Sequence, residues 1–173
     1  MTLRTRIIEI IGAVLAVLLQ IIIAPHIALA AAIPNFIVAF AMLLSVTRRR
    51  AYGCVLPFVL GLLFDFMSGG PVGAMAFTLT LVTMFASRAF LLLDNDTLFM
   101  PAVIMAAGLL IVEVCYALIL SALGYNAAFV DLLVYRAVPC FVYNMIVALI
   151  FYPVVSRFLV VEEPSHHDVL QLR

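Results

Sequence analysis

Three polar residues lie alone in long apolar stretches of the chain, and they are the first candidates for chemistry. Asp65, Glu113 and Asn144 are each flanked by aliphatic and aromatic residues. A charged group in such a stretch is costly and requires a polar partner or water. Asp65 could therefore bind a cation, relay a proton or hold the local structure together. Glu113 and Asn144 could form a polar site between helices or a hydrogen bond that only fixes helix packing.

Asp65 also belongs to a row of small residues, which we call the small-residue stripe. Four-residue spacing places successive members close together on one helix surface. Because missing side chains let another backbone approach closely, the stripe predicts a face for helix packing or for partner binding. Residues 68–71, Ser-Gly-Gly-Pro, then predict a turn, so Asp65 should lie at a tight helical hairpin. The stripe comprises Gly53, Pro57, Gly61, Asp65 and Gly69, and Gly73 after the turn is assigned to the same surface.

The familiar catalytic combinations are missing from the sequence. It contains no Ser-His-Asp or Cys-His set, no paired carboxylates within one helical turn, no phosphate-binding glycine loop and no HExxH motif. His166 and His167 stand together in a polar tail, where two side chains without further ligands indicate solvated residues rather than a metal site. We therefore expect no catalytic residues, no cofactor and no metal, and we do not expect an enzyme.

The composition of the chain indicates whether water or lipid surrounds the protein. Hydrophobic residues make up 68% of the chain, charged residues only 10%, and the mean hydropathy is +1.31. These values are far outside the range of a soluble domain. Nine arginines balance nine carboxylates, so there is no basic excess to indicate nucleic acid. The chain is predicted to be an all-α integral membrane protein in contact with membrane lipids.

Six apolar segments must position the polar residues. A membrane-spanning helix needs about 20 mostly apolar residues, or about 17 at the short end. The segments predict about six transmembrane helices in one bundle, a single domain over residues 1–161 and a short cytoplasmic tail over residues 162–173. The second and third segments are short, so this pair could instead form one interfacial hairpin in a four-helix protein. The segments are 7–24, 33–47, 51–67, 72–93, 100–123 and 134–161.

The arginines predict the orientation. If the N-terminus is cytoplasmic, six spans leave eight of the nine arginines on or near the inner side and only Arg136 towards the outside. Both termini are then cytoplasmic. The first segment resembles a secretory signal because Arg4 and Arg6 precede it, but Glu9 and the length of the apolar run favour a permanent helix.

The same topology brings Asp65 and Arg136 to a similar depth near the outer surface. Each would carry a desolvation cost if it were unpaired, so we predict that they pair or share a polar network. Arg136 could instead extend to lipid headgroups or meet Asp131.

Residues 61–73 resemble the signature of a known family. They read Gly-Leu-Leu-Phe-Asp-Phe-Met-Ser-Gly-Gly-Pro-Val-Gly, which is similar to the pattern G-L-L-x-D-L-x-S-G-x-P-x-G of the rod-shape-determining MreD family. The length of the chain, the number of spans and the short basic loop before the third segment also agree, so the resemblance covers nearly the whole chain. Asp65 and its flanking glycines match the signature. Weaker correspondences are Glu113, Arg136 and Asn144.

This resemblance implies a multi-pass protein of the bacterial inner membrane that acts in cell elongation. Members of the family pair with MreC, a single-span protein with a large periplasmic part. They help to connect cytoplasmic MreB filaments to peptidoglycan synthesis by RodA and its class B penicillin-binding protein. The implied activity is scaffolding rather than catalysis.

The family also resembles the substrate-binding membrane components of energy-coupling-factor transporters, which supplies an alternative function. Such a component would bind a vitamin or another small solute in a pocket with several convergent polar groups. The chain has no Trp, short outer loops and few polar residues to line a pocket. Its first segment also lacks the Ala-x-x-x-Ala face that these components tend to use for docking. We therefore expect no such pocket and favour the scaffold.

Overall fold

The computed structural model describes residues 3–28, 33–47, 53–93, 99–124 and 129–159. Within these ranges the chain is helical and contains no strand. Several predictions fall on other residues and lie outside the described ranges: the basic loop at 48–50, the tail at 162–173 and its two histidines.

Six helical rods make up the described fold. The first five are single helices, and the last is continuous through a short π-helical stretch, η2. A 3-10 turn, η1 (Ala24–Ile27), follows the first rod. The rods are α1 (Leu3–Ile22), α2 (Phe36–Thr47), α3 (Val55–Ser68), α4 (Ala74–Leu92), α5 (Phe99–Ala122) and the run α6 (Phe129–Leu132), η2 (Leu133–Ala137) and α7 (Val138–Leu159).

The predicted all-helical fold is confirmed for the described residues. Each of the six predicted segments contains a helix. The largest difference is at the last rod, which begins at Phe129 rather than at residue 134. Three helices in the described ranges are long and apolar enough to cross a membrane, namely 74–92, 99–122 and 129–157. Helices α2 and α3 are apolar but shorter.

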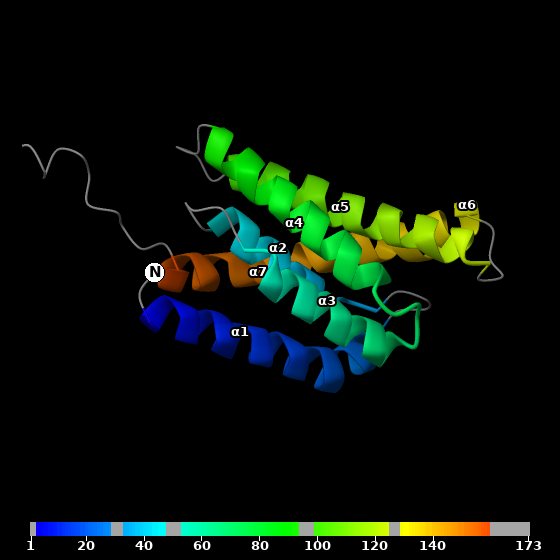
Figure 1. Ribbon diagram of the computed structural model, residues 1–173, viewed down its shortest axis with the longest axis horizontal. Helices are drawn as coiled ribbons and strands as arrows, with labels where there is room; N and C mark the ends of the chain where they lie inside the picture. Colours follow the sequence, from blue (N-terminus) through cyan, green and yellow to red (C-terminus); the bar gives the residue numbers. More distant parts are fainter. Residues whose placement is uncertain (1–2, 29–32, 48–52, 94–98, 125–128, 160–173) are drawn as a thin grey trace, which may run out of the picture.

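Helix α2 is the centre of the bundle. It packs against α1, α3, α4, α5 and α7 (Figure 1), and of its residues only Phe40 is not fully buried. A helix lying at a membrane surface would expose one side. The burial of α2 therefore argues against the four-helix alternative, in which α2 and α3 form an interfacial hairpin.

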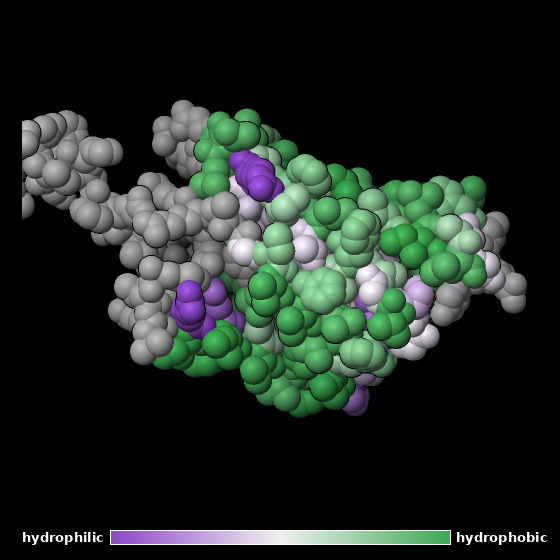
Figure 2. All heavy atoms as spheres, viewed as in Figure 1, coloured by the Kyte–Doolittle hydropathy of each residue, from purple (hydrophilic) through white to green (hydrophobic). Residues whose placement is uncertain are grey.

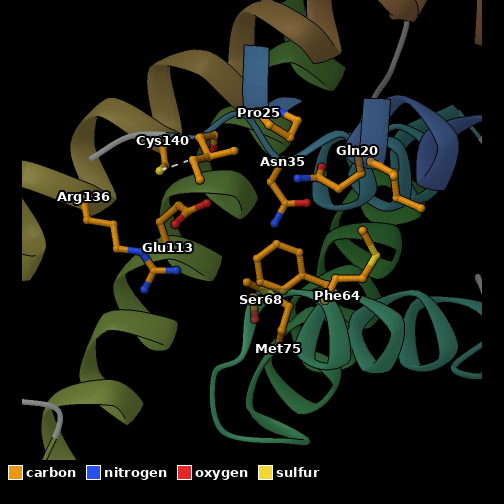
Figure 3. A pocket seen from close by; sticks show the side chains of 12 residues that line it. Gln20, Pro25, Asn35, Phe64, Ser68, Met75, Glu113, Arg136 and Cys140 are labelled. Carbon is orange, nitrogen blue, oxygen red and sulfur yellow. Dashed lines mark hydrogen bonds between the residues drawn. The ribbon is translucent and has the colours of Figure 1, made fainter. Parts of the chain in front are cut away.

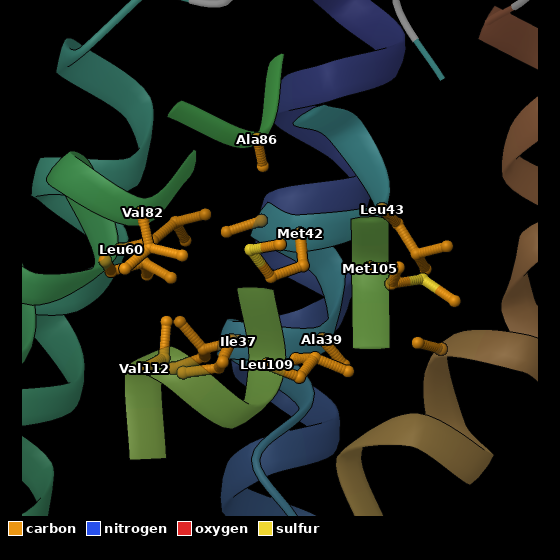
Figure 4. Close-up of a cluster of buried hydrophobic side chains, with 14 of the residues drawn as sticks. Ile37, Ala39, Met42, Leu43, Leu60, Val82, Ala86, Met105, Leu109 and Val112 are labelled. Atoms are coloured by element: carbon orange, nitrogen blue, oxygen red, sulfur yellow. The ribbon is translucent and has the colours of Figure 1, made fainter. Parts of the chain in front are cut away.

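The core around α2 is built mainly from aliphatic and methionine side chains, and α1, α3, α4, α5 and α7 all contribute to it; Figure 4 shows part of this core. Met42 and Leu43 of α2 meet Met105 and Leu109 of α5 there, and all four are essentially inaccessible to solvent. The outside of the bundle is also apolar, and hydrophobic residues cover most of the face seen in Figure 2. A protein with an apolar core and an apolar surface is suited to lipid rather than water.

Consecutive rods run in opposite directions, so the bundle has two distinct ends (Figure 1). We call the end that holds the start of α1 and the end of α7 the terminal end. The opposite end holds the connection between α3 and α4, and we call it the hairpin end.

Gly61 allows the backbones of α3 and α4 to approach closely. A Cβ built on Gly61 would lie 2.5 Å from the Cα of Ala76 in α4. Backbone atoms cannot move aside as the end of a flexible side chain can. The α3–α4 contact therefore depends on the absence of a side chain at this position.

Gly61→Ala is expected to destabilise the purified protein. Overpacking costs typically about 1–3 kcal/mol, and here it opposes a helix-propensity gain of roughly 1 kcal/mol. Thermal unfolding in detergent should show a lower midpoint for this variant. Gly53→Ala is the control, because a Cβ there would meet nothing within 4 Å. Equal midpoints for the two variants would contradict the close-approach argument.

Candidate functional site

Asp65 is almost fully buried and caps the start of α4. Its Oδ2 accepts hydrogen bonds from the backbone N–H groups of Gly73 at 2.9 Å, Met75 at 3.1 Å and Ala76 at 3.2 Å. The N–H of Met75 also lies 3.1 Å from Oδ1. The first N–H groups of a helix have no partner within that helix, and the N-terminus carries partial positive charge. A carboxylate from α3 therefore satisfies these donors and matches the sign of the α4 dipole.

The turn between α3 and α4 depends on glycine at two positions. Gly69 ends α3 with φ of 65°, and Gly73 begins α4 with φ of 97°, both in the left-handed region. Residues with a side chain rarely adopt this backbone conformation, whereas glycine adopts it at no steric cost. The predicted turn at 68–71 and the tight hairpin at Asp65 are thus present in the structure.

The small-residue stripe does not form one uniform surface. Pro57, Gly61 and Asp65 are buried, and Gly61 and Asp65 face α4 within the same molecule. Gly53 is exposed and has no neighbour in reach of a Cβ. The middle of the stripe is therefore a packing face inside the bundle rather than a face offered to a partner.

Glu113 and Asn144 belong to a second buried network, which joins three further segments. Asn144 of α7 donates from Nδ2 to Glu113 Oε1 of α5 at 2.8 Å. Its Oδ1 accepts the backbone N–H of Asn35 at 2.7 Å, just before α2. Asn35 in turn accepts the N–H of Val38 with its Oδ1 at 3.1 Å, which caps the start of α2. The two residues predicted at similar depth are thus directly bonded.

Gln20 of α1 completes this network from the other side. Its Oε1 accepts the N–H of Phe36 at 2.8 Å, and its Nε2 donates to the carbonyl oxygen of Pro34 at 3.2 Å. From its sequence position Gln20 could be read as a residue of the membrane interface. In the structure it is buried and ties α1 to the beginning of α2.

Arg136 does not pair with Asp65, so the predicted direct ion pair is wrong. Its guanidinium lies over the ring of Tyr116, 4.7 Å from the ring centroid, as a cation–π contact. Tyr116 also meets the edge of Phe64 at 6.2 Å between centroids. The reason for the error is local: Asp65 already accepts hydrogen bonds from the start of α4, and Arg136 is held on an aromatic ring.

The π-helical stretch η2 contains Arg136. Its wide turn is visible in the bond from the N–H of Val138 to the carbonyl oxygen of Leu133, five residues earlier. Pro139 follows directly, and a proline ring clashes with the carbonyl four residues before it in a regular α-helix. A wider turn relieves that clash, and such insertions often occur at functional positions.

A cavity of about 600 Å³ lies at this place, and residues of the second network and Met75 at the start of α4 are among those that line it (Figure 3). The expectation that the bundle lacks a pocket with convergent polar groups is therefore wrong. Residues far apart in the sequence supply these groups, which is why composition did not predict them. The polar lining residues are Gln20, Asn35, Ser68, Glu113, Arg136 and Cys140.

The residues of the described ranges offer no site for a metal, since no three His, Cys, Asp or Glu side chains cluster there. Sequence reasoning missed the structural role of Gln20 and Asn35. One signal was available for each: an amide in an apolar run at Gln20, and an N-capping residue directly before an apolar helix at Asn35.

Comparison with known families assigns the chain. The family model described as rod shape-determining protein MreD matches residues 3–161. The chain belongs to the MreD family. The matched region includes both networks and the cavity, and the hairpin at Asp65 is built by the residues that resemble the MreD signature. No curated protein and no solved structure matches this chain. Family membership and the long apolar helices identify a rod-shape-determining membrane protein.

Asp65→Ala is expected to lower stability by more than Asp65→Asn. Alanine leaves three backbone N–H groups without the carboxylate, and one unsatisfied buried donor costs about 1–3 kcal/mol. Asparagine keeps one acceptor oxygen and should retain part of the cap. The measurement is thermal unfolding in detergent, with Asp131→Ala as a control because Asp131 is exposed. If Asp65→Ala unfolds at the same temperature as the control, the cap is not important for stability.

Proposed function

We propose that this MreD family member is a non-catalytic membrane scaffold of the bacterial cell-elongation machinery. It would bind an MreC-like single-span protein and so help to link MreB filaments to peptidoglycan synthesis by RodA and its class B penicillin-binding protein. Family membership supports this role. The observation that carries the partner-binding part is an apolar groove on the side of the bundle.

The groove lies between α1 and α7, with α2 as its floor. Its volume is about 270 Å³, and every residue that lines it is apolar or glycine. Helix α1 packs on α2 and touches α7 only sparingly, which leaves the space open. Its lining residues are Ile8, Ile11, Gly12, Leu15, Ala16 and Leu19 of α1, Phe36, Ala39, Phe40 and Leu43 of α2, and Val147, Phe151, Val154 and Val155 of α7.

A transmembrane helix of a single-span partner is the occupant that fits this groove. The α1 wall runs from Ile8 to Leu19, which at 1.5 Å per residue is about 17 Å of helix. Exposed apolar side chains of its walls, among them Ile11, Leu15 and Val154, would pack against such a helix, whereas Ala16 and Ala39 are buried beneath them. Association of helices in lipid relies on such packing, because lipid tails supply little hydrophobic drive.

Val154→Trp is expected to reduce copurification with the MreC-like partner at least tenfold. An indole at Val154 fills the groove, and a tenfold loss corresponds to about 1.4 kcal/mol. Ile150→Trp is the matched control, because Ile150 is 64% exposed on the same helix and does not line the groove, while Val154 is 51% exposed. Both variants should unfold at the wild-type temperature. Equal partner recovery with both would contradict the groove as the contact.

The proposed location is the inner membrane, as a multi-pass protein with both termini in the cytoplasm. The arginine distribution supports this orientation. Arg6, Arg88 and Arg157 are exposed and belong to the ends of α1, α4 and α7 that form the terminal end. Arg136 lies in the rod that starts at the hairpin end, which would face the periplasm.

Thiol labelling tests this orientation. Cys54 is exposed just before α3, at the end of that helix opposite the hairpin, so an impermeant maleimide should label it only after the inner membrane is opened. Asp131→Cys, at an exposed position of α6, should be labelled in intact spheroplasts. The Asp131→Cys substitution is made in a Cys54→Ala background, so that labelling of residue 131 is not confused with labelling of Cys54. Labelling of Cys54 in intact spheroplasts would refute the orientation.

The cavity favours a second candidate, the substrate-binding membrane component of a vitamin or other small-solute transporter. Its volume of about 600 Å³ lies within the range of small-molecule sites, about 300–1,000 Å³. A likeness in fold to the components of energy-coupling-factor transporters is part of this candidate. Thermal shifts of the purified protein with a panel of vitamins discriminate the two, because a scaffold without a vitamin site would show none.

A further inference from the structure

Three polar groups around the cavity have hydrogen-bonding capacity that the described structure does not use. Within the described residues, the Oε2 of Glu113 accepts no hydrogen bond, although its Oε1 is bonded to Asn144. The guanidinium N–H groups of Arg136 and the Nδ2 of Asn35 likewise find no acceptor in the described ranges. None of these atoms is both buried and unsatisfied, so they have access to open space. All three residues line the cavity.

This pattern differs from that of the neighbouring polar residues. Both oxygens of Asp65 accept backbone N–H groups, and both ends of the Gln20 and Asn144 amides are bonded. The hydrogen bonds of those groups are made within the protein, so they need no ligand. Glu113, Arg136 and Asn35 keep open positions on the same cavity, which is the arrangement of a binding site with few convergent polar groups.

The charges around the cavity are opposite, and Arg136 lies near enough to Glu113 to act on it electrostatically. Glu113 and Arg136 both lie on its wall, and no ion pair joins them among the described residues. A lone cation would satisfy Glu113 but leave Arg136, and a lone anion would do the reverse. A ligand that carries both charges can neutralise both residues without bringing net charge into an apolar bundle.

We propose that this cavity binds a zwitterion that carries an ammonium group and an anionic oxygen. The ammonium N–H groups donate to the open oxygen of Glu113, while Arg136 and the Nδ2 of Asn35 donate to the anionic oxygen. The apolar part of the ligand lies along Ile21, Ile33 and Met67, which line the same cavity and are 54%, 49% and 43% exposed. This binding activity goes beyond scaffolding.

Two sources supply this chemistry: a free amino acid or short peptide, and the headgroup of a phosphatidylethanolamine lipid. The cavity of about 600 Å³ is large enough for either. Both have a primary ammonium group and an anionic oxygen separated by a few bonds. They differ in whether acyl chains must continue into the membrane.

Isothermal titration of the full-length protein in detergent tests the proposal with defined probes. L-alanyl-L-alanine represents the free solute, and glycerophosphoethanolamine represents the headgroup. Glycerophosphocholine carries the same charges but no ammonium N–H, and ethanolamine and glycerol phosphate each carry charge of one sign only. We expect a zwitterionic probe with N–H donors to bind at least tenfold more tightly than these three. Binding of the dipeptide alone identifies a solute; binding of glycerophosphoethanolamine, with phosphatidylethanolamine retained on purification, identifies the lipid.

Variants link the binding to the cavity. Glu113→Gln and Arg136→Gln should each weaken the preferred probe at least tenfold, whereas Asp131→Asn should leave it unchanged because Asp131 is exposed and does not line the cavity. Met67→Trp blocks the cavity from its exposed wall without touching the hydrogen-bond network, and it should abolish binding if the other variants prove unstable.

Two results would overturn the proposal: no heat of binding with either zwitterion, or affinities for glycerophosphocholine, ethanolamine and glycerol phosphate that equal theirs. Retained affinity in a folded Met67→Trp variant would also overturn it. Each result leaves copurification with an MreC-like partner intact, so failure here is distinguishable from failure of the scaffold.

Discussion

The architecture depends on satisfying backbone N–H groups at helix starts that are buried in apolar surroundings. A helix leaves its first donors without partners, and hydrocarbon offers no water to accept them. Here side chains provide the acceptors: Asp65 for α4, and Gln20, Asn144 and the local cap Asn35 for the start of α2. The bonds of Asp65, Gln20 and Asn144 also connect two elements, so the same contacts that permit buried helix starts hold the bundle together.

This requirement concentrates polar atoms at one depth of the molecule. The starts of α2 and α4 both lie towards the hairpin end, and the acceptors that serve them come from α1, α3 and α7. The cavity lies beside these side chains, and Gln20 and Asn35 are among the residues that line it. Polar groups required for folding and polar groups available to a ligand are therefore neighbours, as Glu113 shows with one oxygen in each role.

Sequence reasoning predicted the helices well and the contacts unevenly. Apolar runs and the glycine-rich turn after Asp65 are local signals, so the six rods and the hairpin followed from them. The hydrogen-bond partners of Asp65, the N–H groups at the start of α4, did not follow from such signals, because they depend on the path of the chain after the turn. Arg136 was assigned to the wrong partner because Asp65 is already bonded to the start of α4 and the guanidinium of Arg136 lies on the ring of Tyr116. The cavity was missed because its lining comes from segments more than 100 residues apart, from Gln20 to Cys140.

The shortness of α3 has a consequence for the surrounding bilayer. It spans 14 residues, or about 21 Å, against a hydrocarbon thickness of about 30 Å. Unlike α2, it exposes apolar side chains on its outer side, among them Phe58, Val59 and Phe66. Where so short a flank meets lipid, thinning of the bilayer, snorkelling of flanking side chains or association with a neighbour compensates for the mismatch, each at a cost that grows with every ångström.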